Sequence, residues 1–422
     1  MKKIKHPWRS AATALLAVAS AGTTATAHAQ EKMSYSLFGT VGAAVSNRDY
    51  AYQRHIDSNG TLERDSVLGG QVDVQFTPEW SATLQAKVAP SIKRENRWDI
   101  TPSWAFVSWR PNNDWLLRAG KLRIPLYLAS ENLDVGQSYD FARLPTDMYS
   151  ISPTSDVIGL FITRSWAVGD ADLSVDAYSG QARIWNRFYT RDTGAKYDVF
   201  KTKVSGLVLT WRADETMLRL GLHHADTEPR GSTVFYETAV YNPMGPGLGY
   251  YTPSGIAPKI VNDIVTVGVD QKLPGNWRVM GELGRSFQHK TDFGQNTLGG
   301  YVAVLKNMDR WTPYVYASSL KSLGAPERLH EALTQSSVPA YIPGADIINA
   351  GQRQLADGVP FYDQHSLALG TSFALTPRSK LKAEWLRTWV DKGSIMVDSQ
   401  GTGQAVHDET IDVLSLSYSF AF

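Results

Sequence analysis

The chain contains no cysteine, no excess of charge of one sign and no long hydrophobic run beyond its first residues. Without cysteine there can be no disulfide framework, no thiolate metal site, no cysteine nucleophile and no lipid-modified N-terminal cysteine. The 42 Lys and Arg residues nearly balance the 41 Asp and Glu residues, which argues against a nucleic-acid partner. Beyond residue 29 no run of 18 apolar residues occurs, so the sequence predicts no transmembrane helix.

The first 29 residues have the three parts of a secretory signal peptide. Four basic residues precede a small apolar stretch from Ala11 to Ala19, and Ala27-His28-Ala29 forms an A-x-A cleavage pattern. We therefore expect residues 1–29 to be removed after Ala29 and residues 30–422 to form the mature, exported protein. The mature part carries 38 basic and 41 acidic residues.

Beyond the signal peptide the dominant pattern is an alternation of period two in segments of about ten residues. In the final segment, which runs from Ile411 to Phe422, every second residue from Leu414 onward is a leucine or an aromatic residue, and serines occupy most of the positions between them. Successive side chains of a β-strand point to opposite faces, so such a strand is apolar on one face and polar on the other. The pattern predicts an all-β protein.

The connections between these segments come in two sizes that largely alternate. Short turns are predicted near residues 77–79, 111–114, 168–171, 213–215, 274–276, 307–310 and 376–378. Longer loops are predicted at residues 47–65, 89–101, 123–156, 180–202, 225–260, 288–295, 320–363 and 390–409. An even number of strands, here about sixteen, with short periplasmic turns and long extracellular loops is typical of an antiparallel transmembrane β-barrel of the outer membrane.

Tryptophan supports this interpretation, because most of these residues lie beside a predicted short turn. Amphipathic rings concentrate where hydrocarbon meets lipid headgroups. Closure is also required in a membrane, since an open sheet edge would leave backbone groups unpaired in hydrocarbon. The tryptophans near short turns are Trp80, Trp109, Trp115, Trp166, Trp211, Trp277 and Trp311, with Phe373 beside the last turn.

In strand number, in its alternating turns and in the terminal aromatic segment Ser417 to Phe422, the mature chain resembles the Gram-negative outer-membrane porins. Residues 117–125 are similar to a stretch of the phosphate-selective-type porins, although the Pro-Glu-Phe-Gly motif of the general trimeric porins is absent. The resemblance implies that the loop after the fifth strand, residues 123–156, folds into the lumen as a constriction. It also implies a homotrimer in contact with outer-membrane lipid and lipopolysaccharide.

A barrel of about sixteen strands is too wide for side chains to fill and normally encloses an aqueous channel. We therefore expect a porin that allows passive or facilitated diffusion of small polar or anionic solutes. The alternative is a barrel closed by its own loops that serves as a structural or interaction partner. No Gly-rich phosphate loop, G-x-S-x-G turn or spaced His and carboxylate pattern occurs, so we expect neither an enzyme nor a cofactor.

The sharpest candidates for a functional site are charged residues of the inferred constriction and of the wall around it. Opposed charges across a pore select solutes by charge, whereas charges paired within the loop would only hold its shape, and the sequence leaves both open. The candidate pore-lining and constriction residues are Lys87, Arg118, Arg123, Glu131, Asp134, Asp140, Arg143 and Arg219.

Two further segments carry recognisable patterns. Residues 180–202 interleave basic and aromatic side chains, which suits either lipopolysaccharide phosphates, an aromatic or sugar ligand, or simple packing of a surface loop. Residues 326–333 begin with proline and continue with good helix formers, which predicts a short helix at the barrel mouth.

Overall fold

A computed structural model describes residues 32–152, 154–401 and 405–422, and the predicted signal peptide lies outside the described residues. Within those ranges no helix is both long and apolar enough to cross a membrane. The elements, in chain order, are β1 Lys32–Ser46, β2 Ala51–Tyr52, β3 Val67–Gln75, β4 Trp80–Pro90, β5 Trp98–Trp109, β6 Trp115–Arg123, η1 Gly136–Ser138, α2 Thr146–Tyr149, β7 Asp156–Val168, β8 Ala171–Thr190, β9 Gly194–Arg212, β10 Thr216–Pro229, β11 Phe235–Gly245, β12 Leu248–Ala257, β13 Ile260–Leu273, β14 Trp277–His289, β15 Thr297–Lys306, β16 Trp311–Ser322, α3 Ala325–Gln335, α4 Ala345–Gly358, β17 Tyr362–Thr376, β18 Ser379–Ser394, β19 Val397–Asp398 and β20 Glu409–Ala421.

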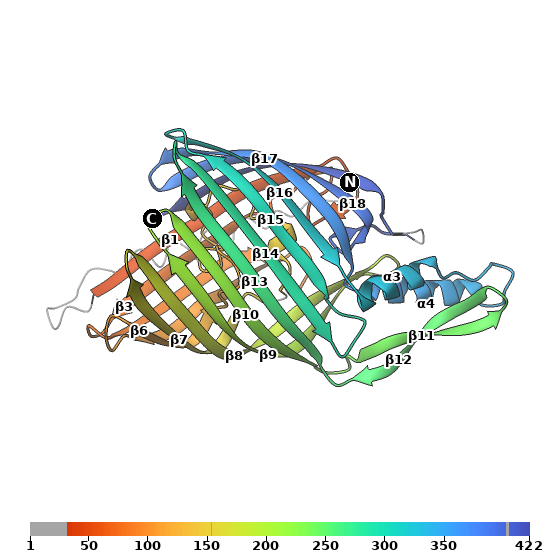
Figure 1. The fold of residues 1–422 in the computed structure, drawn as a ribbon. Helices are drawn as coiled ribbons and strands as arrows, with labels where there is room; N and C mark the ends of the chain where they lie inside the picture. Colours follow the sequence, from red (N-terminus) through yellow and green to blue (C-terminus); the bar gives the residue numbers. More distant parts are fainter. Residues whose placement is uncertain (1–31, 153, 402–404) are drawn as a thin grey trace, which may run out of the picture.

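Sixteen of these strands form one closed antiparallel barrel (Figure 1). The barrel strands neighbour one another in chain order, and β1 closes the ring by pairing with β3 on one side and with β20 on the other. In that closing pair Phe38 lies opposite Ala421 and Ser46 lies opposite Val413. The predicted strand number, antiparallel pairing and closure between the first and last strands are confirmed.

The alternation in the sequence decides which side chains face inward. On β20, Leu414 and Leu416 are exposed on the outer surface, while Ser415 and Ser419 between and beyond them are buried inside. Exposed leucine, isoleucine and valine side chains recur on the outer face of the other strands, as expected of a surface that meets hydrocarbon. The polar face of each strand therefore lines the inside of the barrel.

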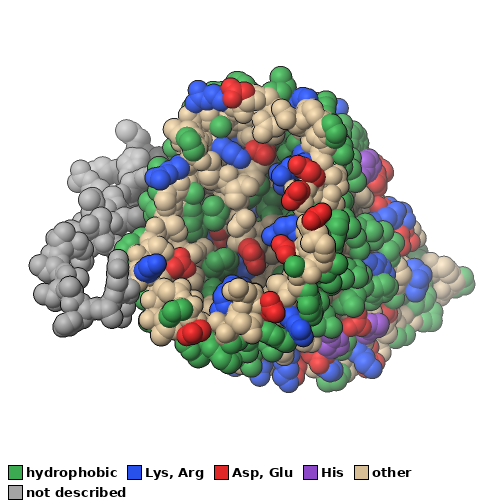
Figure 2. All heavy atoms as spheres, turned by 60° about the vertical axis from the view of Figure 1, so that its left-hand side comes forward, with side chains coloured by type: hydrophobic (Ala, Val, Ile, Leu, Met, Phe, Trp, Pro, Cys, Tyr) green, Lys and Arg blue, Asp and Glu red, His purple; other side chains and the backbone are tan. Residues whose placement is uncertain are grey.

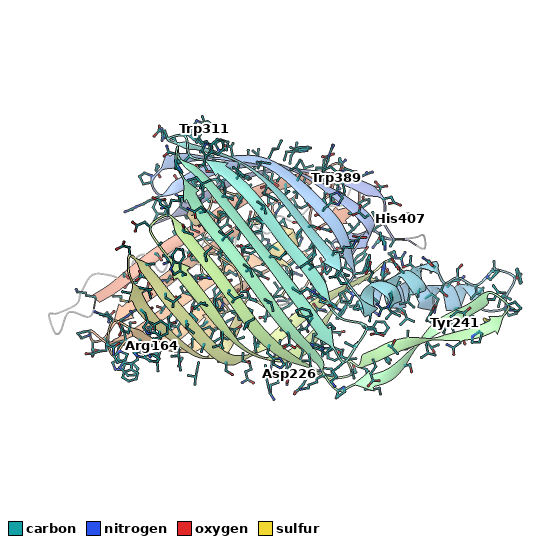
Figure 3. The ribbon with its side chains drawn as sticks, viewed as in Figure 1. Arg164, Asp226, Tyr241, Trp311, Trp389 and His407 are labelled. Carbon is teal, nitrogen blue, oxygen red and sulfur yellow. The ribbon has the colours of Figure 1, made fainter. Side chains whose placement is uncertain are left out.

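The short turns gather at one end of the barrel and the long loops at the other. Trp311 and Arg164 mark the short-turn end in Figure 3, and Trp389 and Asp226 lie toward the long-loop end. At the short-turn end Trp80 stacks on Trp109 with ring centroids 5.7 Å apart. Most of the predicted tryptophans lie there, and the seven predicted short turns are all present.

The prediction of a loop at residues 180–202 is wrong, because β8 and β9 continue through most of it and leave only residues 191–193 as a turn. The charged residues of this segment obscured the fact that the two-residue alternation of a strand continues through it. Ile184 and Phe200 face each other across the two strands and are both buried, and Phe188 packs edge-on against Phe200. Gly194, at a positive φ of 77°, allows the chain to reverse there.

The other two large loops have structure of their own. Residues 230–259 contain the hairpin β11–β12, and residues 323–361 contain α3 and α4, all of which lie at the long-loop end (Figure 1). Leu333, Val359 and Phe361 form a small apolar core within this group. The helix expected over residues 326–333 is confirmed as α3.

Candidate functional site

Residues 124–155 connect β6 to β7, and we call them the inner segment. Its described residues, 124–152, 154 and 155, pack against the inward faces of the barrel strands. The prediction of this segment gave residues 123–156, which agrees with the structure to one residue at each end. It is largely irregular, with one turn at η1 and one at α2. Its buried apolar residues include Ile124, Leu126, Tyr127, Phe141, Ala142, Leu144, Met148 and Ile151.

Phe141 is the main apolar anchor of the inner segment. Its side chain is 1% exposed and meets the rings of Tyr314, Tyr316 and Tyr301 edge-on, at centroid distances of 5.1, 5.7 and 6.2 Å. The tyrosines stand on the inward faces of β15 and β16. The backbone N–H of Ala142 donates a hydrogen bond of 2.8 Å to the hydroxyl of Tyr314, so the same tyrosine also fixes the backbone.

Two glycines in the wall make room for α2. A Cβ added to Gly284 would lie 2.2 Å from Cδ1 of Ile151, and one added to Gly299 would lie 2.6 Å from the carbonyl oxygen of Asp147. Real Cβ contacts are essentially never shorter than 3.0 Å. The close approach of the inner segment to β14 and β15 therefore depends on the absence of side chains at these two positions.

Buried carboxylates receive hydrogen bonds across the same interface. Glu282 of β14 accepts hydrogen bonds from the backbone N–H of Leu128 at 2.8 Å and from the hydroxyl of Tyr149 at 2.7 Å. Asp147 of α2 accepts hydrogen bonds from Ser318 of β16 and Gln364 of β17. Burial raises the pKa of Asp147, and these hydrogen bonds only partly oppose the rise.

Asp134 joins two of the predicted cations. Lys87 of β4 donates to its Oδ1 and Arg123 at the end of β6 donates to its Oδ2, both at 2.6 Å. Burial disfavours the charged carboxylate, but the two cations outweigh it and hold the pKa of Asp134 well below its usual range. Two cations sharing one carboxylate leave this corner of the lumen with a net positive charge.

The other predicted charged residues of the inner segment, with one exception, also form ion pairs with residues outside it. Asp140 pairs with Lys380 of β18 at 2.8 Å, and Arg143 makes a bidentate pair with Asp65 at 2.7 and 2.5 Å. Glu131 is the exception, since its side chain is exposed. Most of these charges therefore join the inner segment to its surroundings, while the pair of Arg123 and Asp134 lies within the predicted loop 123–156.

Arg118 and Arg219 lie on the inward face of the wall and meet none of the carboxylates of the inner segment. Arg118 lies 4.0 Å from Asp176, and its guanidinium lies 5.8 Å from the ring of Phe161. Arg219 donates a hydrogen bond of 2.6 Å to the carbonyl oxygen of Tyr127. The structure thus brings Lys87, Arg123 and Asp134 together and leaves the remaining predicted residues in separate contacts.

The inside of the barrel is asymmetric. The inner segment covers the inward faces of β14 to β20 and of β1, where polar residues such as Ser318, Gln364, Thr388 and Ser419 are buried. On the opposite half, Lys87 of β4 and Arg118 of β6 remain partly accessible at 24% and 20%, whereas other inward polar residues there, such as Gln85, Thr210 and His223, are buried. Figure 2 shows a hollow at the short-turn end with acidic and basic side chains around it.

Sequence reasoning missed several residues that hold the inner segment in place. Tyr301, Tyr314 and Asp65 contact it directly but were not selected. Tyr301 and Tyr314 occupy inward positions of strands whose outer neighbours are aliphatic, so an aromatic residue at a polar-face position is the signal that could have found them. Asp65 lies in the loop 47–66, where the sequence offers no comparable signal.

Several solved structures share this fold. The chain is similar to the trimer form of OmpT, an outer-membrane protein of Vibrio cholerae, with a TM-score of 0.52, 9% identity and coverage of 92% of this chain and 99% of that chain. It is also similar to the outer-membrane channel DcaP of Acinetobacter baumannii (TM-score 0.51, 12% identity, 94% and 100% coverage) and to an anion-selective porin from Comamonas acidovorans (0.50, 12%, 93% and 100%). No protein-family model and no curated protein sequence matches the chain.

Proposed function

We propose that the protein is an outer-membrane porin, through which small polar or anionic solutes diffuse along the half of the lumen that the inner segment leaves uncovered. The fold is that of outer-membrane porins. The observation that carries the proposal is that two inward cations of β4 and β6, Lys87 and Arg118, stay partly accessible beside the inner segment. A sixteen-stranded barrel normally keeps an aqueous channel.

The preference for anions rests on the cations that border the accessible half. Lys87 and Arg118 are partly exposed there, and Arg219 binds a carbonyl oxygen, so no carboxylate neutralises its charge directly. Arg123 and Arg143 are also cationic, but their side chains are only 3% and 7% exposed, whereas Lys87, which shares Asp134 with Arg123, is 24% exposed. We assign these two to holding the inner segment and the other three to contact with solutes.

Planar-bilayer recording with the purified protein tests both parts of the proposal. We expect discrete open steps and, in a KCl gradient, a reversal potential on the anion-selective side. Arg118→Gln combined with Arg219→Gln should shift the reversal potential toward zero, whereas Arg164→Gln on the outer surface should not. A silent bilayer would favour a barrel closed by its loops that acts as a structural or interaction partner, and an unchanged reversal potential would refute the assignment of the arginines.

The proposal extends to export and assembly. We infer that residues 1–29 direct export and are removed after Ala29, which N-terminal sequencing of the protein from isolated outer membranes would check. We also infer a homotrimer, supported by the trimer form of one structure with the same fold. Light scattering of the detergent-solubilised protein should give about three times the mass of one chain, and a monomer mass would refute this assembly.

A further inference from the structure

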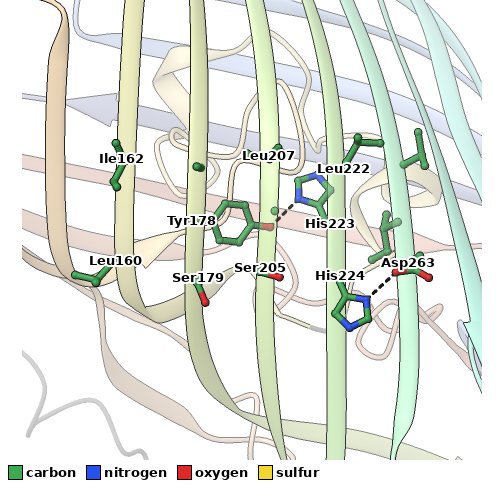
Figure 4. Close-up of a pocket in the computed structure, with 14 residues that line it drawn as sticks. Leu160, Ile162, Tyr178, Ser179, Ser205, Leu207, Leu222, His223, His224 and Asp263 are labelled. Atoms are coloured by element: carbon green, nitrogen blue, oxygen red, sulfur yellow. Dashed lines mark hydrogen bonds and ion pairs between the residues drawn. The ribbon is translucent and has the colours of Figure 1, made fainter.

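The outer surface of the barrel carries a groove of about 690 Å³ that crosses β7, β8, β9, β10 and β13 (Figure 4). Its edges include the exposed side chains of Leu160, Leu207 and Leu222. Between them stand the short side chains of Ala177, Ser179 and Ser205. These residues alternate with Tyr178 and His223, which are buried on the inner side and joined by a hydrogen bond of 2.7 Å. The groove therefore opens toward the surface that meets lipid.

Three cations follow the groove on the same outer face, toward the long-loop end. Arg183 and Lys201 occupy directly opposite positions on β8 and β9, and Lys203 lies one outward position nearer the groove. Like charges opposite each other on neighbouring strands are destabilising. In the described part of the chain neither Arg183 nor Lys201 has a carboxylate partner, and Lys203 has only a loose contact with Glu228 at 3.9 Å.

The next cation along β8 toward the strand end, by contrast, has carboxylate partners. Arg187, two outward positions beyond Arg183 on β8, is paired with both Glu95 and Asp398. The fold therefore supplies two carboxylates to one arginine near the barrel rim. Below it, Glu228 and Asp226 of β10 lie opposite Lys201 and Lys203 in register, but Arg183 and Lys201 make no ion pair within 4 Å in the described part of the chain. An anion from outside the chain would relieve the repulsion between Arg183 and Lys201.

Measured along the membrane normal from the short-turn end, the position of Arg183 and Lys201 matches the headgroup level of the outer leaflet. Leu173 of β8 lies opposite Trp211 of β9 in the aromatic belt at the short-turn end, and Arg183 lies ten residues further along the strand. Ten residues extend about 34 Å along a strand, or roughly 24 Å along the membrane normal at a tilt of about 45°. The apolar band of such barrels is about 25 Å tall, so Arg183 and Lys201 lie at its far edge. Lys203, two residues nearer Trp211, lies roughly 5 Å inside that edge, and the groove with its exposed His224–Asp263 ion pair lies within the band.

We propose that the groove and these three cations bind one phosphate-bearing lipid of the outer leaflet, with an acyl chain in the groove and the phosphate between Arg183, Lys201 and Lys203. The proposal rests on the proposed outer-membrane location, because that location places this face against lipid. Charge-assisted hydrogen bonds from arginine and lysine suit phosphate oxygens. The acyl chain covers Leu160, Leu207 and Leu222 and fills the space above the small residues.

Binding of dioleoyl phosphatidic acid to the purified, detergent-solubilised barrel tests the site, with native mass spectrometry and thermal unfolding as readouts. Dioleoylglycerol, which lacks the phosphate, and inorganic phosphate, which lacks the chains, separate the two halves of the ligand. We expect phosphatidic acid to remain bound and to raise the melting temperature, and the other two probes to do neither. Equal binding of inorganic phosphate would overturn the lipid in favour of a free-anion site.

Variants locate the site on the barrel. Arg183→Gln combined with Lys201→Gln should weaken phosphatidic acid binding at least tenfold and abolish the rise in melting temperature. The matched control, Arg164→Gln with Lys306→Gln, removes two outward cations at the short-turn end and should change neither. Ser205→Trp should weaken binding with all cations in place, because its ring fills the groove.

Two results would overturn the proposal. One is binding of phosphatidic acid to the Arg183 and Lys201 double variant as strongly as to the wild type. The other is a Ser205→Trp variant that still binds phosphatidic acid but no longer forms an oligomer that the wild type forms. That result would assign the groove to a second copy of the chain. Conductance of the same variants separates this proposal from the channel, since a silent barrel that still binds phosphatidic acid contradicts only the porin.

Discussion

Phe141 is the residue whose truncation should most clearly release the inner segment from the wall. Its ring is buried among Tyr301, Tyr314 and Tyr316, and none of the barrel's strand pairing depends on it. Truncation of a buried phenylalanine to alanine costs about 3–5 kcal/mol. Edge-to-face ring contacts supply about 0.5–1.5 kcal/mol for each pair within that loss. Because the strands are untouched, the loss falls on the docking of the inner segment.

A loss of about 3 kcal/mol should raise the undocked population of the inner segment by roughly a hundredfold, since about 1.4 kcal/mol corresponds to a factor of ten. The amide of Ala142 reports this directly, because its N–H is hydrogen-bonded to the hydroxyl of Tyr314 at 2.8 Å. Hydrogen exchange of residues 124–155 in Phe141→Ala should accelerate by that factor. Exchange of the barrel strands should stay the same.

The matched control is Phe287→Ala, which removes a phenylalanine from the outer face of β14, where the residue is 41% exposed. It should leave exchange in the inner segment unchanged. In bilayers Phe141→Ala should add rapid current fluctuations that the control lacks. If exchange in residues 124–155 is as slow in Phe141→Ala as in the wild type, the aromatic anchor does not hold the segment and the reasoning fails.

Three further predictions concern the surroundings of this anchor. Gly284→Val places a Cβ 2.2 Å from Ile151, so we expect α2 to shift and limited proteolysis to cut the inner segment faster; unchanged cleavage would contradict the contact. Arg143→Met leaves Asp65 buried without its cation, which should cost about 3–5 kcal/mol in thermal unfolding, and Asp65→Leu in the same chain should recover most of it. Burial, with a smaller effect of a nearby arginine, lowers the pKa of His330 to about 4, so the neutral ring is favoured in the folded state. Its contribution to stability should therefore be complete above about pH 6.5 and fall as the pH drops toward 4, and His330→Leu should flatten the acid-induced increase in exchange of α3.

The barrel could be predicted from sequence because each strand carries its own signal. On β20 the leucines and serines alternate strictly, and this pattern alone assigns the outer and inner faces that the structure shows. Turns such as Pro274-Gly275-Asn276 mark the short connections with equal clarity. The method failed at residues 180–202, where Arg183 and Arg187 made an extended strand pair resemble a loop, although Ile184 and Phe200 kept the strand period.

The candidate site was only partly accessible to sequence reasoning, for a physical reason. The positions of Lys87, Arg118 and Arg219 on the inward face follow from the strand period. The contacts of the inner segment do not, because they join Asp134 to a strand 47 residues away and Arg143 to Asp65. Such pairs depend on how an irregular segment is folded inside the barrel, and no local pattern encodes that path.

The asymmetry of the lumen connects the stability of the inner segment to the proposed selectivity. Burying a charge in a nearly dry interface requires a partner, so Arg123 and Arg143 are paired with Asp134 and Asp65 on the covered side. A cation that borders water does not require such a partner, since water solvates it: Arg219 bonds only to neutral oxygens, although the partly exposed Lys87 also pairs with Asp134. The same residue type therefore serves two purposes on the two sides of the inner segment. Displacing the inner segment would expose charges of both signs to the lumen. The positive potential that the cations of the accessible wall produce would then be weaker, and so would the preference for anions.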